Sequence, residues 1–409
     1  MRKIITILLV YSGMSLNIQA QPFDFWKFRD KQNSQKENPV KFDYRVNFEY
    51  NLDNREFDVG KNLYTNSMTI NAARLTPQIG FKVNDKSMTH NVMLGIDVLK
   101  NMGESPVSKA DRSLENSSLL RELLLYYNVK AKSGKALISG YAGVFPRSFS
   151  VGEYDNAFYS DSLRFYDNNI EGVLLNVISS KAVYEIGLDW MGQYGRGRRE
   201  RFLIFSSGNI HFNTLITAGW SFFGYHLANM VEYGGVVDNI LASPFIKLSL
   251  GRNLWIQDFS VKLSYLQGFQ RDRLVSSKFV FPKGGQIDLR VMNWNIGIEN
   301  KLYVGKSLMP FYNKIDAGGN KYGSLLYFGD PFYRIFHNDK TYNAVGVYDR
   351  LELFYQPHIS DFIDLKISIM GHFATNENGK IGFMGSRQKL SLIFNLEKWK
   401  NKTRNNKTY

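Results

Sequence analysis

The chain has 409 residues, a formal net charge of +14, no cysteine and 15% aromatic residues, including 30 Phe and 24 Tyr. The lack of cysteine excludes a lipoprotein anchor, a disulfide framework and thiolate metal sites, and we expect no metal ion and no cofactor. A basic chain can bind nucleic acid, but the sequence contains no motif of that kind, and export would separate the chain from such a partner.

The first twenty residues predict export. Arg2 and Lys3 precede an apolar run and a short polar stretch, which is the pattern of a secretory signal peptide. We therefore interpret residues 1–20 as a signal peptide and residues 21–39 as a polar periplasmic leader. No later segment contains 18 consecutive apolar residues, so we expect no transmembrane helix.

Apolar and polar residues then alternate without a break from Val40 to Leu52, which reads VKFDYRVNFEYNL. Because a strand sends successive side chains to opposite faces, one face of this segment is apolar and the other is charged. Soluble strands average about 5–6 residues, whereas a tilted strand needs about 9–11 to cross a bilayer. The pattern predicts a strand with lipid on one side and water on the other.

Residues 40–394 are predicted to form a transmembrane antiparallel up-and-down β-barrel of about 16 strands. Counts of about 14 or 18 fit nearly as well, because region 286–341 can be divided in more than one way. The predicted strands are 40–52, 68–83, 87–100, 117–132, 135–147, 167–179, 181–194, 200–212, 214–227, 238–251, 254–270, 286–303, 307–315, 342–357, 361–375 and 380–394.

The connections between the predicted strands alternate in length. Those after even-numbered strands are tight, and most of those after odd-numbered strands are longer and polar. Short periplasmic turns and long external loops are typical of bacterial outer-membrane barrels. A secreted β-sandwich also has alternating strands, but the strand length and the alternation in loop length favour the barrel.

Residues 395–409 follow the predicted barrel and form a basic tail. We expect this tail either to be solvated or to contact a periplasmic partner.

The connection after the fifth predicted strand is rich in acidic and aromatic residues and reads PRSFSVGEYDNAFYSDSLRFYDN. In this feature, and in architecture over residues 40–394, the chain resembles the porin family. In porins the third loop folds into the lumen, and its acidic residues face basic residues of the barrel wall. The resemblance implies that Glu153, Asp155 and Asp161 form the acidic side of a constriction. The alternative is a solvated loop whose aromatic residues pack on the barrel rim.

A basic counterpart is present in the segment GRGRRER, which contains Arg196, Arg198, Arg199 and Arg201. Rings of like charge bias ion passage, and guanidinium groups bind phosphate or carboxylate in a bidentate manner. These arginines therefore predict a weak preference for anions. Equally, external arginines can bind lipopolysaccharide phosphates at the membrane surface.

An outer-membrane hydrolase is the enzymatic alternative, and of the six histidines only His226 and His337 fall near external loops. Neither lies in a recognisable hydrolase motif, and a catalytic serine cannot be assigned from one sequence. We therefore expect no enzymatic activity.

The sequence predicts a Gram-negative outer-membrane channel for passive diffusion of small hydrophilic solutes. The expected partners are outer-membrane lipid and lipopolysaccharide, the solutes and the barrel assembly machinery, while the oligomeric state stays open. A barrel of about 16 strands can leave an aqueous lumen. A substrate-specific uptake barrel that binds its ligand at the third loop is the other alternative.

Overall fold

The computed structural model describes residues 40–58, 64–85, 87–103, 119–228, 230–254, 256–335 and 344–397. The predicted signal peptide, the leader and residues 398–409 of the predicted tail lie outside these ranges. Among the helices that the structure describes, none is long and apolar enough to cross a membrane.

Seventeen antiparallel strands form one sheet. They are β1 (Lys41–Phe57), β2 (Met68–Asp85), β3 (Met88–Asn101), β4 (Leu120–Ser133), β5 (Ala136–Pro146), β6 (Asn169–Ile178), β7 (Ala182–Gly192), β8 (Arg201–His211), β9 (Ile216–Leu227), β10 (Val237–Ser249), β11 (Asp258–Asp272), β12 (Lys283–Asn293), β13 (Ile296–Lys306), β14 (Val345–Tyr355), β15 (His358–Ser360), β16 (Ile363–Thr375) and β17 (Ile381–Asn395).

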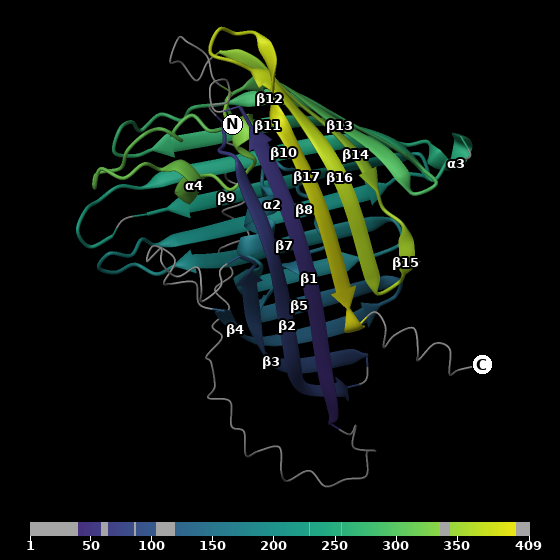
Figure 1. The fold of residues 1–409 in the computed structure, drawn as a ribbon. Helices are drawn as coiled ribbons and strands as arrows, with labels where there is room; N and C mark the ends of the chain where they lie inside the picture. Colours follow the sequence, from purple (N-terminus) through teal and green to yellow (C-terminus); the bar gives the residue numbers. More distant parts are fainter. Residues whose placement is uncertain are drawn as a thin grey trace. The chain divides into compact units, whose positions relative to one another are not determined.

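The sheet closes on itself because β1 pairs with both β2 and β17. The purple β1 and the yellow β17 lie side by side in Figure 1. The three-residue β15 pairs only with the end of β16, while β14 pairs with β16 directly. The closed ring therefore has sixteen strands, which confirms the predicted fold class.

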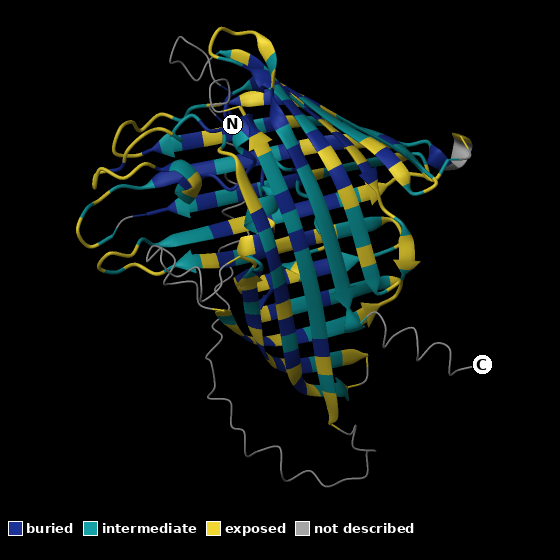
Figure 2. Cartoon of the chain, in the orientation of Figure 1, coloured by how far each residue is buried: buried dark blue, intermediate teal, exposed yellow. Residues whose placement is uncertain are grey.

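Exposure alternates along the strands, as the checkered colouring of Figure 2 shows. In β3, Val92 is 54% exposed, whereas its neighbour Asn91 is 4% exposed. The outward positions are apolar and the buried inward positions include many polar side chains, such as Asp97 and Asn128. A barrel with lipid outside and a polar interior requires this distribution.

Two of the predicted strands are wrong. The segment 286–303 falls within two strands, β12 and β13, which are joined by a tight turn at Trp294 and Asn295 with φ values of 49° and 66°. Positive φ at both central residues matches the twist of a hairpin. The segment 307–315 contains no strand of the sheet and begins the connection after β13. The first error misses one strand and the second adds one, so the predicted number of about 16 strands is unaffected.

The connections divide the barrel into a short-turn end and a long-loop end. Two connections at the long-loop end contain the candidate site: the third loop (residues 147–168) and the seventh loop (residues 307–344). The third loop contains the 3₁₀ turn η5 (Arg147–Phe149) and the helix α2 (Asp161–Tyr166). The seventh loop contains α4 (Gly323–Leu326) and η6 (Pro331–Tyr333), and a short helix α3 (Gly251–Leu254) lies at the short-turn end.

The alternation predicts that adjacent positions on β1 differ in their tolerance of charge. Phe48 pairs with Leu75, which is 40% exposed, while Asn47 belongs to the inward set of β1. Phe48→Arg should reduce the free energy of unfolding in lipid vesicles by about 2–4 kcal/mol, because arginine at the bilayer midplane is costly. The matched control Asn47→Arg should have a much smaller effect. Equal destabilisation by both variants would contradict the inside-outside assignment.

Candidate functional site: two loops inside the barrel

The buried carboxylate of Glu185, on β7, holds the start of the third loop against the barrel wall. It accepts hydrogen bonds from the backbone N–H of Val151 at 2.5 Å and of Gly152 at 3.1 Å, and from the hydroxyl of Ser150 at 2.6 Å. The Tyr154 hydroxyl donates to the same carboxylate at 3.0 Å. Backbone groups of loops are rarely buried, because a buried N–H or C=O needs a hydrogen-bond partner. Glu185 is that partner for two backbone N–H groups of the third loop.

Two arginines also hold the third loop, one near each of its ends. Arg74 of β2, fully buried, pairs with Asp97 and donates to the backbone carbonyl of Phe165 in α2. At the other edge of the loop, Arg147 pairs with Asp189 of β7 at 2.8 Å. The third loop is thus fixed at both ends by buried charged groups of the barrel wall, which places it inside the lumen.

The three acidic residues implied by the porin resemblance all face basic side chains of the wall. Glu153 pairs with Lys262 of β11 at 2.9 Å, and Asp155 pairs with Lys301 of β13 at 3.4 Å. Asp161 pairs with two basic residues of β17, Arg387 at 3.0 Å and Lys389 at 3.4 Å. The structure therefore brings acidic groups of the loop against basic groups of the wall.

Asp155 lies at the centre of a buried polar network. One carboxylate oxygen accepts from the hydroxyl of Tyr333, in the seventh loop, at 2.9 Å, and the other accepts from Gln286 of β12 at 2.8 Å. Burial acts to raise the pKa of Asp155, but the ammonium groups of Lys301 and Lys262 hold that pKa well below its usual range. The carboxylate therefore stays ionised at neutral pH and in mild acid.

The pKa of Asp161 is lowered by basic residues of the wall in the same way. Burial again acts to raise its pKa, and the positive charges of Lys389 and Arg387 outweigh burial, so that the pKa lies well below the usual value. Because the depressed pKa belongs to the folded state, these loop-to-wall pairs contribute stability at neutral pH. That contribution is lost only when the pH falls below the ordinary range of an aspartate and through the depressed pKa.

The seventh loop is held inside the barrel by hydrogen bonds to strand side chains. Gln270 of β11 donates to the carbonyl of Leu308 at 2.7 Å, and Asn239 of β10 donates to the carbonyl of Leu326 at 2.9 Å. The Tyr322 hydroxyl donates to Asp272 at 2.8 Å. These contacts place the loop along the β10 and β11 side of the lumen.

The third and seventh loops also bond to each other through their backbones. The N–H of Asp330 donates to the carbonyl of Asn156 at 2.7 Å, and the N–H of Ser160 donates to the carbonyl of Phe328 at 2.8 Å. Between these bonds, a Cβ built at Gly329 would lie 2.2 Å from the carbonyl oxygen of Ala157. The close approach requires glycine and joins the two loops into one unit.

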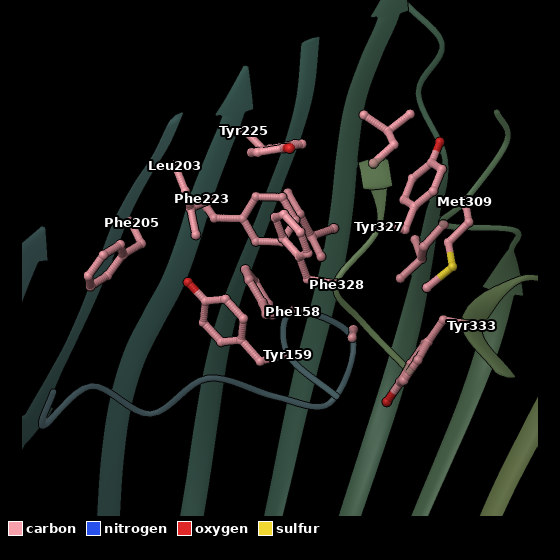
Figure 3. Packing of buried hydrophobic residues seen from close by; sticks show 14 of the residues in the cluster. Phe158, Tyr159, Leu203, Phe205, Phe223, Tyr225, Met309, Tyr327, Phe328 and Tyr333 are labelled. Atoms are coloured by element: carbon pink, nitrogen blue, oxygen red, sulfur yellow. The ribbon is translucent and has the colours of Figure 1, made fainter. Parts of the chain in front are cut away.

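An aromatic cluster fills the space between this unit and the wall. Figure 3 shows Phe158 of the third loop beside Phe223 of β9 and Phe328 of the seventh loop. The ring centroids of Phe158 and Phe223 are 5.3 Å apart, and those of Tyr225 and Phe328 are 4.7 Å apart. The cluster fills the β8 to β11 side of the lumen with packed apolar side chains, and it continues to Phe57 of β1 and Tyr348 of β14.

The opposite side of the lumen contains two successive cavities. The outer cavity, of about 430 Å³, is lined by residues that include Arg55, His372 and Arg387. The inner cavity, of about 310 Å³, is lined by residues that include Lys366 and Lys389. Along β16 and β17 the outer-cavity residues lie nearer the long-loop end and the inner-cavity residues nearer the short-turn end.

Asp161 lines both cavities and therefore stands at the point where they meet. Its carboxylate bridges Arg387, which lines the outer cavity, and Lys389, which lines the inner one. A solute that moved from one cavity to the other would pass this charged group. The arrangement can narrow a route along the wall formed by β14, β16, β17 and β1.

The predicted arginine group lies elsewhere, on the rim between β7 and β8. Arg196 and Arg198 are exposed, and Arg199 pairs with Asp316 of the seventh loop. Arg201 donates to the backbone carbonyl of Met191 at 2.7 Å. Arg198, Arg199 and Arg201 line a rim cavity of about 610 Å³ together with aromatic and amide residues. The ion-pair partners of Glu153, Asp155 and Asp161 come instead from the strands.

Sequence reasoning missed those partners. Lys262, Lys301, Arg387 and Lys389 each follow the inward register of their strands, so strand alternation could have identified them as lumen-facing. The sequence contains no signal for which of the many inward charges would meet the third loop. That selection depends on how far the loop reaches into the barrel.

No protein-family model and no curated protein sequence matches the chain. Among solved structures, OpdO of Pseudomonas aeruginosa is 10% identical, with a TM-score of 0.41 over 87% of this chain and 96% of its own. OccD3 of the same organism is 10% identical, with a TM-score of 0.42 over 88% and 93%. A triple mutant of the Rhodopseudomonas blastica porin is 9% identical, with a TM-score of 0.42 over 87% and 100%.

The polar network around Asp155 predicts unequal effects of two substitutions in the same loop. Asp155→Ala should lower the free energy of unfolding by roughly 1–3 kcal/mol, because it leaves buried hydrogen-bond donors without a partner. Glu153→Ala removes a pair in which the glutamate side chain is 41% exposed, so its effect should stay within about 1 kcal/mol. Urea unfolding of the two variants in detergent micelles measures the difference. A larger loss for Glu153→Ala would contradict the assigned burial.

Proposed function

We propose that the chain is an outer-membrane channel of a Gram-negative bacterium that lets small hydrophilic solutes diffuse passively. The observation that carries the proposal is the pair of successive cavities on one side of a lumen whose other side is closed by packed loops. An apolar outer surface and a polar interior suit a barrel in a membrane. The long-loop end is then external, and the short-turn end faces the periplasm.

In this proposal Glu153, Asp155 and Asp161 form the acidic side of the constriction. Asp161 alone of the three lines both cavities, so it stands where a solute would pass from one to the other. The lining of the inner cavity carries charges of both signs, including Lys301, Arg350, Glu299 and Glu352. Mixed charge hydrates a lumen without strongly selecting one sign of ion, so selectivity in the constriction itself is weak.

A weak anion preference would arise at the external rim rather than in the constriction. Arg196 and Arg198 are exposed there, and the chain as a whole carries a formal charge of +14. Exposed positive charge raises the local concentration of anions at an entrance. Binding of lipopolysaccharide phosphates by the same arginines is the competing account.

The hydrolase alternative finds little support at His226. Its Nδ1 lies 3.6 Å from Asp238, but that carboxylate is held by Arg271 and Arg273, each at 2.8 Å. A carboxylate bound by two guanidinium groups is a poor partner for a histidine that must act as a base. His337 lies outside the described residues. A substrate-specific uptake barrel is the better second candidate, because the outer cavity has the features of a binding site.

Channel activity tests the proposal directly. Purified protein should insert into planar bilayers and give discrete ohmic conductance steps. Deleting residues 150–164 should enlarge each step, because it removes the three carboxylates and the first four residues of α2 from the lumen. As a control, shortening the exposed connection 377–379 should leave the step unchanged. Folded and inserted wild-type protein that never conducts would refute the open channel. Hydrolysis of lipid vesicles by the same preparation would then support the enzyme.

The rim arginines give a separate prediction. Replacing Arg196 and Arg198 with Gln should reduce the anion preference at low salt, as measured by the reversal potential across a salt gradient. The effect should shrink with ionic strength, because the screening length falls from about 10 Å at 0.1 M to 3 Å at 1 M. A reversal potential that stays unchanged at low salt would assign both arginines to the membrane surface.

A further inference from the structure

The outer cavity contains charged groups whose charges are already compensated. Arg387 uses all three of its side-chain nitrogens: two donate to Asp53 at 2.5 Å, and the third lies 3.0 Å from Asp161. Arg55 likewise donates to Asp53, at 2.7 Å, and to the hydroxyl of Ser162 at 2.6 Å. An anionic solute would have to break these pairs to reach Arg387, and the charge of Arg55 is compensated by Asp53.

The formal charges of the arginine and aspartate side chains that line the cavity also balance. Its lining includes two arginines, Arg55 and Arg387, and two aspartates, Asp161 and Asp330. A charged ligand would gain little net attraction from such a lining and would lose its hydration on entry. The balance favours a ligand without net charge.

One buried polar group of the lining has no partner among the described residues. His372 is 1% exposed, and its Nδ1 lies 3.1 Å from the hydroxyl of Tyr348, but its Nε2 makes no hydrogen bond. A buried polar atom without a partner is costly. Because the tautomer of His372 sets whether Nε2 donates or accepts, a ligand hydroxyl, which can do either, fits it.

The rest of the lining combines small hydroxyl groups with aromatic rings. The hydroxyls belong to Thr65, Ser160, Ser162 and Ser324, and the rings include Tyr166, which is 41% exposed, and the half-buried Tyr312. Aromatic faces carry partial negative charge and attract polarised C–H groups, such as those on one face of a sugar ring. A cavity of about 430 Å³ lies within the roughly 300–1,000 Å³ of small-molecule sites.

We propose that the outer cavity is a binding site for an uncharged carbohydrate of one or two rings. The inference deepens the channel function proposed above, since the site lies on the route before the Asp161 constriction. His372 and the serine hydroxyls bind the sugar hydroxyls, and the aromatic rings contact its apolar face. The two arginines shape the site through Asp53 and Asp161 without carrying charge to the ligand.

Three probes of similar size separate this proposal from a charge-based site. Calorimetry on folded protein in detergent should show that glucose binds more tightly than gluconate, its anionic counterpart, or glucosamine in its ammonium form. Maltose should bind at the same site. Tighter binding of gluconate, or no heat with glucose and maltose, would overturn the carbohydrate assignment.

Matched variants locate the site. His372→Phe keeps the ring but removes the Nε2 contact, and should weaken glucose binding roughly fivefold, as expected for one lost hydrogen bond. His226→Phe, on the external rim, should leave binding unchanged. Ser324 is exposed on α4 and lines the cavity, so Ser324→Trp should fill the space and abolish binding, while Ser324→Ala should not. Unchanged binding in Ser324→Trp would place the sugar elsewhere and overturn the proposal.

The same preparation in planar bilayers keeps the two proposals apart. Glucose or maltose should interrupt the current of the wild type and not that of Ser324→Trp. Protein that binds sugar in calorimetry but never conducts would contradict the channel and leave the site standing. Protein that conducts but neither binds sugar nor is interrupted by it would contradict the site and leave the channel standing.

Discussion

Closure of the hydrogen-bond ladder between β1 and β17 is the constraint on which the rest of the molecule depends. In the membrane setting that we propose, an unpaired strand edge would expose backbone groups to hydrocarbon, so the sheet must form a ring. A ring of sixteen strands is wider than its own side chains can fill. The strand side chains therefore leave space in the interior, and the third and seventh loops fill part of it.

The two loops divide the lumen into chemically different halves. Phe158, Phe328 and the strand residues around Phe223 fill one side as part of an apolar cluster that continues to Phe57 and Phe332 beside the outer cavity. The other side keeps its polar lining and its cavities. Ion pairs such as that of Asp161 with Arg387 join the third loop to the polar wall. They are needed because a loop placed among inward charges must carry compensating charges of its own.

Strand alternation made the barrel predictable from the sequence, and the acidic third loop followed from its composition. The hairpin at Trp294 and Asn295 escaped prediction because the turn contains neither glycine nor proline, and alternation continues on both sides of it. The segment 307–315 resembled a strand because it contains several apolar residues, of which Leu308 and Met309 are buried in the loop core instead of facing lipid. The pairing of Asp330 with Asn156 joins distant segments and leaves no local pattern.

The most direct test of the divided lumen uses the absence of native cysteine. Ser391 lines the inner cavity, whereas Ser243 is an inward residue of β10 that is 3% exposed, next to Ser221 of β9. Ser391→Cys and Ser243→Cys are matched substitutions, and a charged thiol reagent can be added while single-channel current is recorded. The account predicts a stepwise fall in current for Ser391→Cys and no change for Ser243→Cys. Equal modification of both positions would contradict it.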